Sequence, residues 1–306
     1  MPLSNRHLLG LHGVPGEDIE LILDTAKTFR EILERPIKKV PTLQGKTVVN
    51  LFFENSTRTR ISFEVAQKRL SADTVNFSTS TSSTKKGETF KDTVRNIEAM
   101  KVDMIVVRHE SAGVPQFLTK ISNCNIINAG DGRHEHPTQA LLDMYSIREK
   151  VGKLRGLKVC IVGDISHSRV ALSNIYGLKA MGAEVSVCGP ATMLPWQIES
   201  LGVKIYSNID DAIKNNDVLN VLRIQLEREA GASIPSVREY HNYFGVTKER
   251  LDENNPDILI LHPGPINRGV ELSSEVADGP YQIILDQVTN GVAIRMAVLY
   301  LLGTMN

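Results

Sequence analysis

The feature that most constrains the fold of this chain is the alternation of short apolar segments with amphipathic ones. The apolar segments are rich in β-branched residues and predict buried strands, whereas the segments between them repeat apolar residues at helical spacing. Strands that alternate with helices predict parallel sheets covered by helices. Because the alternation occurs in two runs, we expect an α/β fold with two open parallel-sheet domains. Each sheet would carry helices on both faces, and long helices would bridge the domains. The main predicted strands are 47–53, 102–107, 125–129, 157–162, 184–188, 218–222 and 257–261. We also expect a helix around 195–201 and a long polar loop over 223–239.

The domain boundaries follow from where the alternation is interrupted. A chain of 306 residues suits two domains of about 150 residues each. Residues 152–156 form a predicted turn after which the alternation begins again. We expect a first domain of residues 1–135 plus 285–306, a second domain of residues 150–284, and a bridging helix over 136–149.

The composition and charge of the chain bear on its partners and its location. Thirty-five basic residues balance thirty-five acidic ones, so the charge gives no support for nucleic acid or an anionic membrane. No apolar run is long enough for a signal peptide or a membrane span. Three widely spaced cysteines predict reduced structural thiols. We therefore expect a soluble, cytoplasmic protein.

The polar stretch 54–60 follows the first predicted strand and precedes a predicted helix, with Asn55 or Ser56 as its N-cap. In that helix apolar residues recur at helical spacing: Phe63, Ala66 and Leu70, with Ile61 and Val65 as a second pair. Free backbone N–H groups and the positive end of the helix dipole meet at such a turn, so an anion is its natural ligand. Ser56, Thr57 and Thr59 add hydroxyl donors, and the Arg58 guanidinium can bind two phosphate oxygens at once. A capped helix start with solvated arginines is the alternative. The density of donors favours phosphate binding.

Further polar residues stand at the ends of other predicted strands, where ligands bind in open α/β sheets. Each alone would be read as a surface residue, but their recurrence at one edge indicates a site for several negative charges, such as a phosphate and a dicarboxylate. The chain lacks the dinucleotide-binding glycine pattern, and 134–136 is too short for a zinc site, so we expect no cofactor and no metal. Group transfer by positioning and charge is the expected chemistry. The residues at the strand ends are Arg108, His136, Arg169, Arg223, Gln225 and the run His262-Pro263-Gly264.

Four motifs together resemble the aspartate and ornithine carbamoyltransferase family. Residues 53–60 (Phe-Glu-Asn-Ser-Thr-Arg-Thr-Arg) resemble its carbamoyl phosphate signature, and 136–139 (His-Pro-Thr-Gln) its second motif. The resemblance continues through Arg169, 223–225 (Arg-Ile-Gln) and 262–265 (His-Pro-Gly-Pro), and so covers essentially the whole chain.

The resemblance implies a role for each motif residue. Ser56, Thr57, Arg58 and Thr59 would bind the phosphate together with Arg108. Thr59, Arg108 and His136 would polarise the carbamoyl oxygen, which makes Arg58, Thr59, Arg108 and His136 the implied catalytic residues. The carbamoyl amino group would be bound by Gln139 and the backbone carbonyls of Pro263 and Gly264. The two carboxylates of L-aspartate would be bound by Arg169, Arg223 and Gln225.

The loop 82–88 and the last motif favour the aspartate branch of the family. The loop resembles one that enters the neighbouring subunit's site, which implies a homotrimer in which Ser82 and Lys86 act in trans, Lys86 on phosphate and on aspartate. Ornithine enzymes would carry His-Cys-Leu-Pro at the last motif and a Ser-Met-Gly loop, neither of which is present. The implied activity is carbamoyl transfer from carbamoyl phosphate to L-aspartate in de novo pyrimidine (UMP) biosynthesis.

Two alternatives stay open at this point. One is transfer to ornithine or another amine, and the other is an inactive anion-binding structural relative, which would be expected to lack Arg58, Arg108 or His136. Regulatory subunits or a dihydroorotase are further partners that the family brings into consideration.

Overall fold

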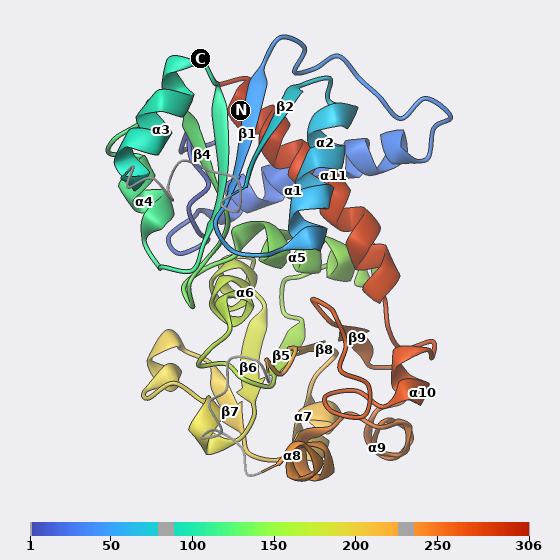
Figure 1. Cartoon of the computed structure of the whole chain (residues 1–306). Coiled ribbons are helices and arrows are strands. Elements are labelled where there is room, and N and C mark those ends of the chain that lie inside the picture. The colour runs from blue at the N-terminus through green and yellow to red at the C-terminus, as the bar shows by residue number, and fades with distance from the viewer. Residues whose placement is uncertain (1, 79–88, 226–235, 306) are drawn as a thin grey trace. The chain divides into compact units, whose positions relative to one another are not determined.

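A computed structural model describes residues 2–78, 89–225 and 236–305 of the chain. The chain forms two compact units, the first made of 1–142 with 289–306 and the second of 143–288. The boundary between them falls within helix α5 (Pro137–Val151). Each unit contains one open parallel sheet, as the alternation of strands and helices predicts (Figure 1).

The first unit is built on a four-stranded sheet in the order β2-β1-β3-β4. All of its strand pairs are parallel, and Phe52 of β1 lies opposite Arg108 of β3. Its central strands are almost continuously buried and mostly apolar, because both faces of the sheet are covered. The strands are β1 (Thr47–Phe52), β2 (Asp73–Ser78), β3 (Met104–His109) and β4 (Asn125–Asp131).

Alternate residues of these strands face different helices. Val49 and Ile105 pack in one core cluster with Val94 of α3 and Leu118 of α4. On the opposite face, the buried amides of Asn50 and Gln67 exchange hydrogen bonds of 2.8 and 3.1 Å, which places α2 there. Figure 1 shows α3 and α4 on one side of the sheet and α1, α2 and α11 on the other. The helices are α1 (Gly16–Leu33), α2 (Thr57–Arg69), α3 (Phe90–Ala99), α4 (Val114–Leu118) and α11 (Ile284–Gly303).

The final helix, α11, returns from the second unit to the first. The Leu302 carbonyl accepts a hydrogen bond of 2.6 Å from Asn125 of β4. Arg295 donates to Ser62 of α2 at 2.9 Å, and its guanidinium lies 5.1 Å from the centre of the Phe63 ring. Residues from 289 onward therefore belong to the core of the first unit.

The second unit is built on a five-stranded parallel sheet in the order β7-β6-β5-β8-β9. One face packs on α7 and α9, where Val162, Leu219 and Leu251 share a core cluster. The strands are β5 (Lys158–Val162), β6 (Glu184–Cys188), β7 (Lys204–Tyr206), β8 (Val218–Val221) and β9 (Leu259–Leu261). The helices are α6 (Arg169–Ala180), α7 (Ile209–Asn215), α8 (Val237–Phe244), α9 (Lys248–Asn254) and α10 (Ser274–Ala277).

Each sheet has one point where the strand order reverses. In the first sheet the chain leaves β1 toward β2 and later continues on the other side with β3. In the second sheet the corresponding reversal lies between β5 and β8. Ligands of open α/β sheets bind beyond the carboxyl ends of the strands at such points. The loops that matter most are therefore those after β1, β3, β5 and β8.

Some local predictions were wrong. A helix is predicted around 195–201, but two 3-10 helices form instead, Ala191–Met193 and Ile198–Leu201. The helices α9 and α10 are missing from the prediction, and α8 begins at Val237, inside a predicted loop that ends at residue 239. Each of these helices is so short that it offers almost no periodicity. No helix in the described ranges is long and apolar enough to cross a membrane.

Candidate active site

The segment between β1 and α2, called the open turn below, forms no side-chain cap on the first turn of the helix. Ser56 is the N-cap, with φ −157° and ψ 86°, but its side chain makes no cap hydrogen bond. The helix starts where Arg60 N–H donates to the Ser56 carbonyl at 3.1 Å. Thr57 and Arg58 are exposed, and Ser56 and Thr59 are half-buried. No acidic residue stands in the first turn of α2. Backbone donors, hydroxyls and a guanidinium thus belong to one partly exposed turn, which suits an anion.

Arg108 lies at the end of β3, the neighbour of β1. Its Nη1 donates to the Ala129 carbonyl of β4 at 3.1 Å, and its Nη2 pairs with Glu54 Oε1 at 3.2 Å. The Arg108 side chain is 11% exposed and that of Glu54 is 16% exposed. The guanidinium is therefore held on one side by the backbone of β4 and on the other by Glu54, in the loop that follows β1.

His136 and Gln139 lie after β4, at the start of α5. His136 is 5% exposed, and its carbonyl accepts from the N–H groups of Gln139 and Ala140 at 3.0 and 3.3 Å. It therefore occupies the N-cap position of α5. The first unit places the open turn, Arg108 and His136 at the carboxyl ends of the adjacent strands β1, β3 and β4.

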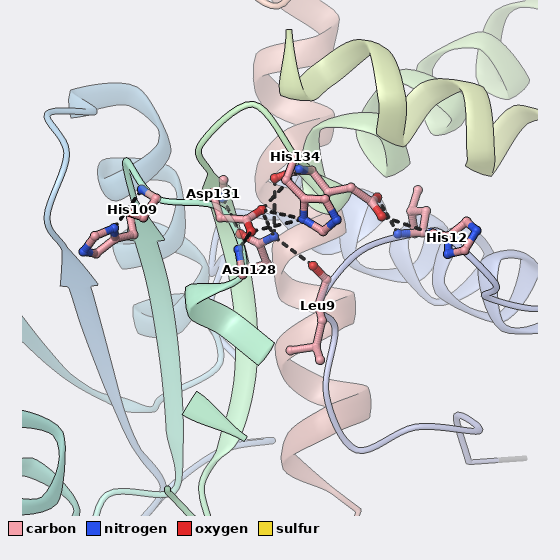
Figure 2. Close-up of polar contacts among 11 residues, drawn as sticks. Leu9, His12, His109, Asn128, Asp131 and His134 are labelled. Atoms are coloured by element: carbon pink, nitrogen blue, oxygen red, sulfur yellow. Dashed lines mark hydrogen bonds and ion pairs between the residues drawn. The ribbon is translucent and has the colours of Figure 1, made fainter. Parts of the chain in front are cut away.

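A buried polar network shapes the loop that carries His136. Asp131 is fully buried, and its carboxylate accepts from Asn128 Nδ2 at 2.8 Å, from Gly113 N–H at 2.8 Å and from Glu135 N–H at 3.2 Å. His134 Nδ1 lies 3.1 Å from the same carboxylate. Figure 2 shows Asn128, Asp131 and His134 gathered on one side of this loop. The network fixes the chain immediately before His136.

The N-terminal segment is tied to the same loop. Asn128 Nδ2 donates to the Leu9 carbonyl at 2.8 Å, and the Glu135 carboxylate accepts from Leu11 N–H at 2.6 Å and His12 N–H at 3.2 Å (Figure 2). A Cβ atom at Gly10 would collide with the Glu135 carboxylate, so a larger residue there would displace that carboxylate from its two backbone donors. Sequence analysis misses these carboxylates, because their partners are backbone groups that are distant in sequence.

In the second unit, the turn between β5 and α6 holds Arg169. Ser168 is the N-cap, and its hydroxyl accepts from Ala171 N–H at 3.2 Å. Asp164 accepts from His167 N–H at 3.1 Å and pairs with the His167 ring at 2.8 Å. Arg169, the first residue of α6, is 6% exposed. The side chains of this turn therefore accept from the N–H groups of His167 and Ala171, and the turn leads into a buried arginine.

Arg223 and Gln225 follow β8, the strand next to β5. Ile224 between them is buried against Met193, Tyr240 and Val270, so its two neighbours project away from that cluster. Gln225 Oε1 is buried, and within the described residues it has no hydrogen-bond partner. The second unit thus places Arg169, Arg223 and Gln225 at the point where its strand order reverses.

Pro263 and Gly264 lie in the loop after β9, the next strand along. This loop is joined to the Arg223 segment, because Asn267 Nδ2 donates to the Ile224 carbonyl at 2.8 Å.

Ser82 and Lys86 lie outside the described residues. The described residues bring together no cluster of three or more histidine, cysteine or carboxylate side chains that could hold a metal ion.

The protonation of several groups is set by burial. Burial raises the pKa of the Cys160 thiol to about 12, and it also raises the pKa of Cys124 and Cys188. These thiols are therefore protonated and poor nucleophiles at neutral pH. Burial lowers the pKa of His109, which lies beside Arg108 at the end of β3.

Comparison with protein families identifies both halves of the chain. Residues 6–149 match the carbamoyl-P binding domain of aspartate/ornithine carbamoyltransferase, and residues 155–302 match its Asp/Orn binding domain. The chain belongs to the aspartate/ornithine carbamoyltransferase family. The resemblance seen in the four motifs is thereby confirmed, and so is the α/β fold with two parallel sheets.

Individual members of the family match over almost the full length. The chain is 64% identical to the aspartate carbamoyltransferase catalytic subunit of Cytophaga hutchinsonii, covering 98% of both chains. It is 61% identical to that of Gemmatimonas aurantiaca, covering 97% of this chain and 93% of the relative.

Solved structures of the family also align over nearly the whole chain. Aspartate transcarbamoylase from Trypanosoma cruzi, in complex with carbamoyl phosphate and aspartate, aligns with a TM-score of 0.87 at 28% identity, covering 97% of each chain. Ornithine carbamoyltransferase from Pyrococcus furiosus also aligns with a TM-score of 0.87, at 31% identity and covering 100% of each chain. The fold is therefore common to both branches.

Proposed function

We infer that this protein is an aspartate carbamoyltransferase. It transfers the carbamoyl group of carbamoyl phosphate to the amine of L-aspartate, and it yields N-carbamoyl-L-aspartate and phosphate for pyrimidine biosynthesis. The observation that carries this conclusion is the 64% identity over 98% of both chains with an aspartate carbamoyltransferase catalytic subunit. Because the fold is shared with an ornithine enzyme, the amine specificity rests on sequence identity and on the charges at the second switch point.

The charges of the second unit support aspartate as the acceptor. Arg169 and Arg223 present cations where the second strand order reverses, and Gln225 adds an amide. Two carboxylates suit two guanidinium groups, whereas the cationic side chain of ornithine would require acids. We propose that these residues bind aspartate, and that Lys86 of a neighbouring subunit assists them.

The first unit would bind carbamoyl phosphate. In this proposal the open turn holds the phosphate through Ser56, Thr57, Arg58 and Thr59, and Ser82 and Lys86 of an adjacent subunit add to it. The fixed guanidinium of Arg108 has the geometry to polarise the carbamoyl oxygen, together with Thr59 and His136. Gln139 and the carbonyls of Pro263 and Gly264 would bind the carbamoyl amino group.

The proposed reaction needs positioning and charge. The aspartate amine attacks the carbamoyl carbon, and the oxyanion of the tetrahedral intermediate is stabilised by Thr59, Arg108 and His136. The C–O bond to phosphate then breaks, and the departing phosphate takes the amine proton. His136 serves as a neutral hydrogen-bond donor in this scheme. Loss of a histidine-like pKa from the rate profile of His136→Ala would instead make it the base.

Product analysis tests the function. Purified protein is incubated with carbamoyl phosphate and either L-aspartate or L-ornithine, and the ureido product is measured. We expect product with aspartate and none with ornithine. Product with ornithine alone would contradict the assignment, and product with neither would favour an inactive anion-binding relative.

The domain roles and the assembly belong to the same proposal. Residues 1–135 with 285–306 would bind carbamoyl phosphate, residues 150–284 would bind aspartate, and 136–149 would bridge them. We propose a cytoplasmic homotrimer with shared sites. Mixing inactive Lys86→Ala chains with inactive Arg58→Ala chains should then restore activity in hybrid trimers. No recovery after confirmed subunit exchange would mean that each site is complete within one chain.

Association with regulatory subunits or a dihydroorotase would add to this trimer. Light scattering can test for such a partner. The molar mass of the assembly isolated from cells is compared with that of the assembly formed by this chain alone, and a larger mass in the first indicates a further subunit.

A further inference from the structure

The ring of His262 is hydrogen-bonded through both nitrogens inside the loop after β9. Gly264 N–H donates to His262 Nδ1 at 2.8 Å, and His262 Nε2 lies 3.1 Å from Glu271 Oε1. A backbone N–H can only donate, so Nδ1 is an acceptor and the ring carries its proton on Nε2. His262 therefore links the carboxylate of Glu271 to the backbone of Gly264 in one defined tautomer.

The pair of His262 and Glu271 is fully enclosed. Both side chains are 0% exposed, and Glu271 Oε1 also accepts from Asn267 N–H at 2.6 Å. Asn267 in turn donates to the carbonyl of Ile224, which stands between Arg223 and Gln225. Buried polar groups are costly unless they are paired, so this arrangement fixes the loop more firmly than apolar packing would.

A second buried carboxylate, that of Asp143, is linked to the same loop through Gln287. His262 N–H donates to Gln287 Oε1 at 3.0 Å, and Gln287 Nε2 donates to Asp143 Oδ1 at 2.8 Å. The other oxygen of Asp143 accepts from Asn174 at 2.9 Å and from Asn220 at 3.1 Å. The backbone and the ring of His262 are therefore both held, and the two residues that follow it have little freedom to move.

Those two residues are Pro263 and Gly264, whose carbonyls bind the carbamoyl amino group in the proposed function. We propose that His262 is a positioning residue that makes the enzyme select carbamoyl phosphate over acetyl phosphate. The two compounds differ at one group, an amino group that can donate hydrogen bonds or a methyl group that cannot. Carbonyl acceptors held rigidly in place reward the amino group, and they remain unpaired beside the methyl group.

This inference rests on the proposed function, because it assumes that the Pro263–Gly264 segment faces the carbamoyl group. With acetyl phosphate the balance of the reaction is unchanged. The aspartate amine attacks the acyl carbon, a C–N bond forms as the C–O bond to phosphate breaks, and the amine proton leaves with phosphate. The ratio of kcat/KM for the two acyl donors therefore isolates recognition of one group.

Two substitutions separate the hydrogen bonds of the ring. His262→Asn keeps an acceptor near Nδ1 for Gly264 N–H, and His262→Gln keeps a donor near Nε2 for Glu271. We expect the carbamoyl-to-acetyl ratio of kcat/KM to fall about tenfold or more in His262→Gln and less in His262→Asn. The Kd of inorganic phosphate should be unchanged in both, because phosphate binds the open turn.

A matched control is available in the first unit. His7 Nδ1 also accepts from a backbone N–H, that of Ile126 at 3.1 Å, and none of the proposed site residues belongs to that contact. His7→Asn should leave the ratio unchanged. An equal loss with both acyl donors in His262→Gln would show a merely structural role and overturn the inference.

A measurement on the unaltered enzyme keeps the inference testable if the variants do not fold. Ring nitrogen shifts of the histidine-labelled, full-length protein should place the proton of His262 on Nε2, as they should for His7 and His109, whose Nδ1 atoms also accept from backbone N–H groups. Glu271→Gln should alter the His262 signal and leave those of His7 and His109 unchanged. A His262 ring protonated on Nδ1 would overturn the inference. If the wild-type enzyme makes no N-carbamoyl-L-aspartate, the proposed function fails. If it makes this product but the ratio does not respond, only the role of His262 fails.

Discussion

The two units contain the same strand–turn–helix element at their switch points and finish it differently. After β1, Ser56 caps α2 without a side-chain hydrogen bond, and Thr57 and Arg58 are exposed. After β5, the Ser168 hydroxyl accepts from Ala171 N–H, and Arg169 is buried. The first turn has no side-chain cap on its backbone donors, whereas in the second turn a serine hydroxyl caps one of them.

This difference matches the groups that each turn would bind. A phosphate offers several oxygens in a compact tetrahedron and can be held by a helix N-terminus itself. A dicarboxylate has two separated anions, so the arginines around it must be held at fixed positions. The open turn would therefore bind its ligand largely through backbone N–H groups. The turn between β5 and α6, called the closed turn, instead holds the side chain of Arg169 in a buried position.

The largest effect should come from removing the side chain that completes the open turn. We expect Arg58→Gln to lower kcat/KM for carbamoyl phosphate about 10²- to 10³-fold, as for loss of one donor to a developing charge. Because Arg58 is exposed, its free energy of unfolding should change by less than about 0.5 kcal/mol. Steady-state kinetics and urea unfolding of the same preparation check both parts.

The matched control for Arg58 lies two residues further along α2. Arg60 pairs with Glu64 at 3.6 Å, along the helix surface. Arg60→Gln should change kcat/KM only a few-fold. Equal losses in the two variants would show that general positive charge on α2, not the open turn, draws the phosphate.

The next largest effect is protection of the open turn by its ligand. At a phosphate concentration of 100 times Kd, binding stabilises the bound state by about 2.7 kcal/mol, or about a hundredfold slower amide exchange. We expect that slowing at the first turn of α2, measured by hydrogen exchange with mass spectrometry. Peptides that cover the start of α6 provide the internal control, and equal slowing there would mean that phosphate does not distinguish the two turns.

The sequence predicts which residue types form these two turns, but it does not predict whether the serine side chain caps the helix. The strand and the burial of Phe63, Ala66 and Leu70 are predicted correctly, because they follow from local periodicity. For the N-cap the sequence offers Asn55 or Ser56, and the structure has Ser56. Ile61, predicted as part of a second apolar pair, is 49% exposed. Whether Ser56 caps its own helix depends on φ and ψ, and residue types alone do not reveal those angles.

The carboxylates behind the site were beyond sequence analysis for a related reason. Asp143 accepts hydrogen bonds from the amides of Asn174, Asn220 and Gln287, which come together only when the second unit folds. A buried acid in a helix is ordinarily read as surface, since unpaired carboxylates are rarely buried. Short helices such as α9, in which Leu251 is the buried residue, lack the repeated apolar positions on which periodicity depends.

A smaller effect concerns the two caps themselves. Ser168→Ala removes a formed cap and should lower the free energy of unfolding by about 1 kcal/mol, whereas Ser56→Ala should cost only a few tenths of that because no cap is lost. In phosphate binding the order should reverse, with only Ser56→Ala weakened. Urea unfolding and phosphate titration of both variants would measure this exchange. Equal destabilisation would show that the two turns are capped alike.

The smallest predicted effect comes from the histidines beside the two turns. His167, at the closed turn, is bound to the Asp164 carboxylate at 2.8 Å. His109, beside the open turn, packs on Phe53 with ring centres 5.3 Å apart, and its Nδ1 accepts from Ser111 N–H at 2.9 Å. Burial lowers the pKa of His109 below its ordinary value of 6.5, although the carboxylates of Glu110, Glu54 and Asp131 oppose the shift.

The direction of that pKa shift fixes the pH dependence of stability. Below pH 6.5 the unfolded chain takes up a proton at His109 before the folded protein does, so the free energy of unfolding falls as the pH is lowered through this window. The contribution of the neutral ring is fully present above pH 6.5. Replacing the ring in His109→Gln should flatten the slope between about pH 7 and pH 5.5, as measured by urea unfolding at several pH values. A steeper slope in the variant, or a His109 pKa above 6.5 by NMR titration, would mean that the nearby carboxylates outweigh burial at the rim of the open turn.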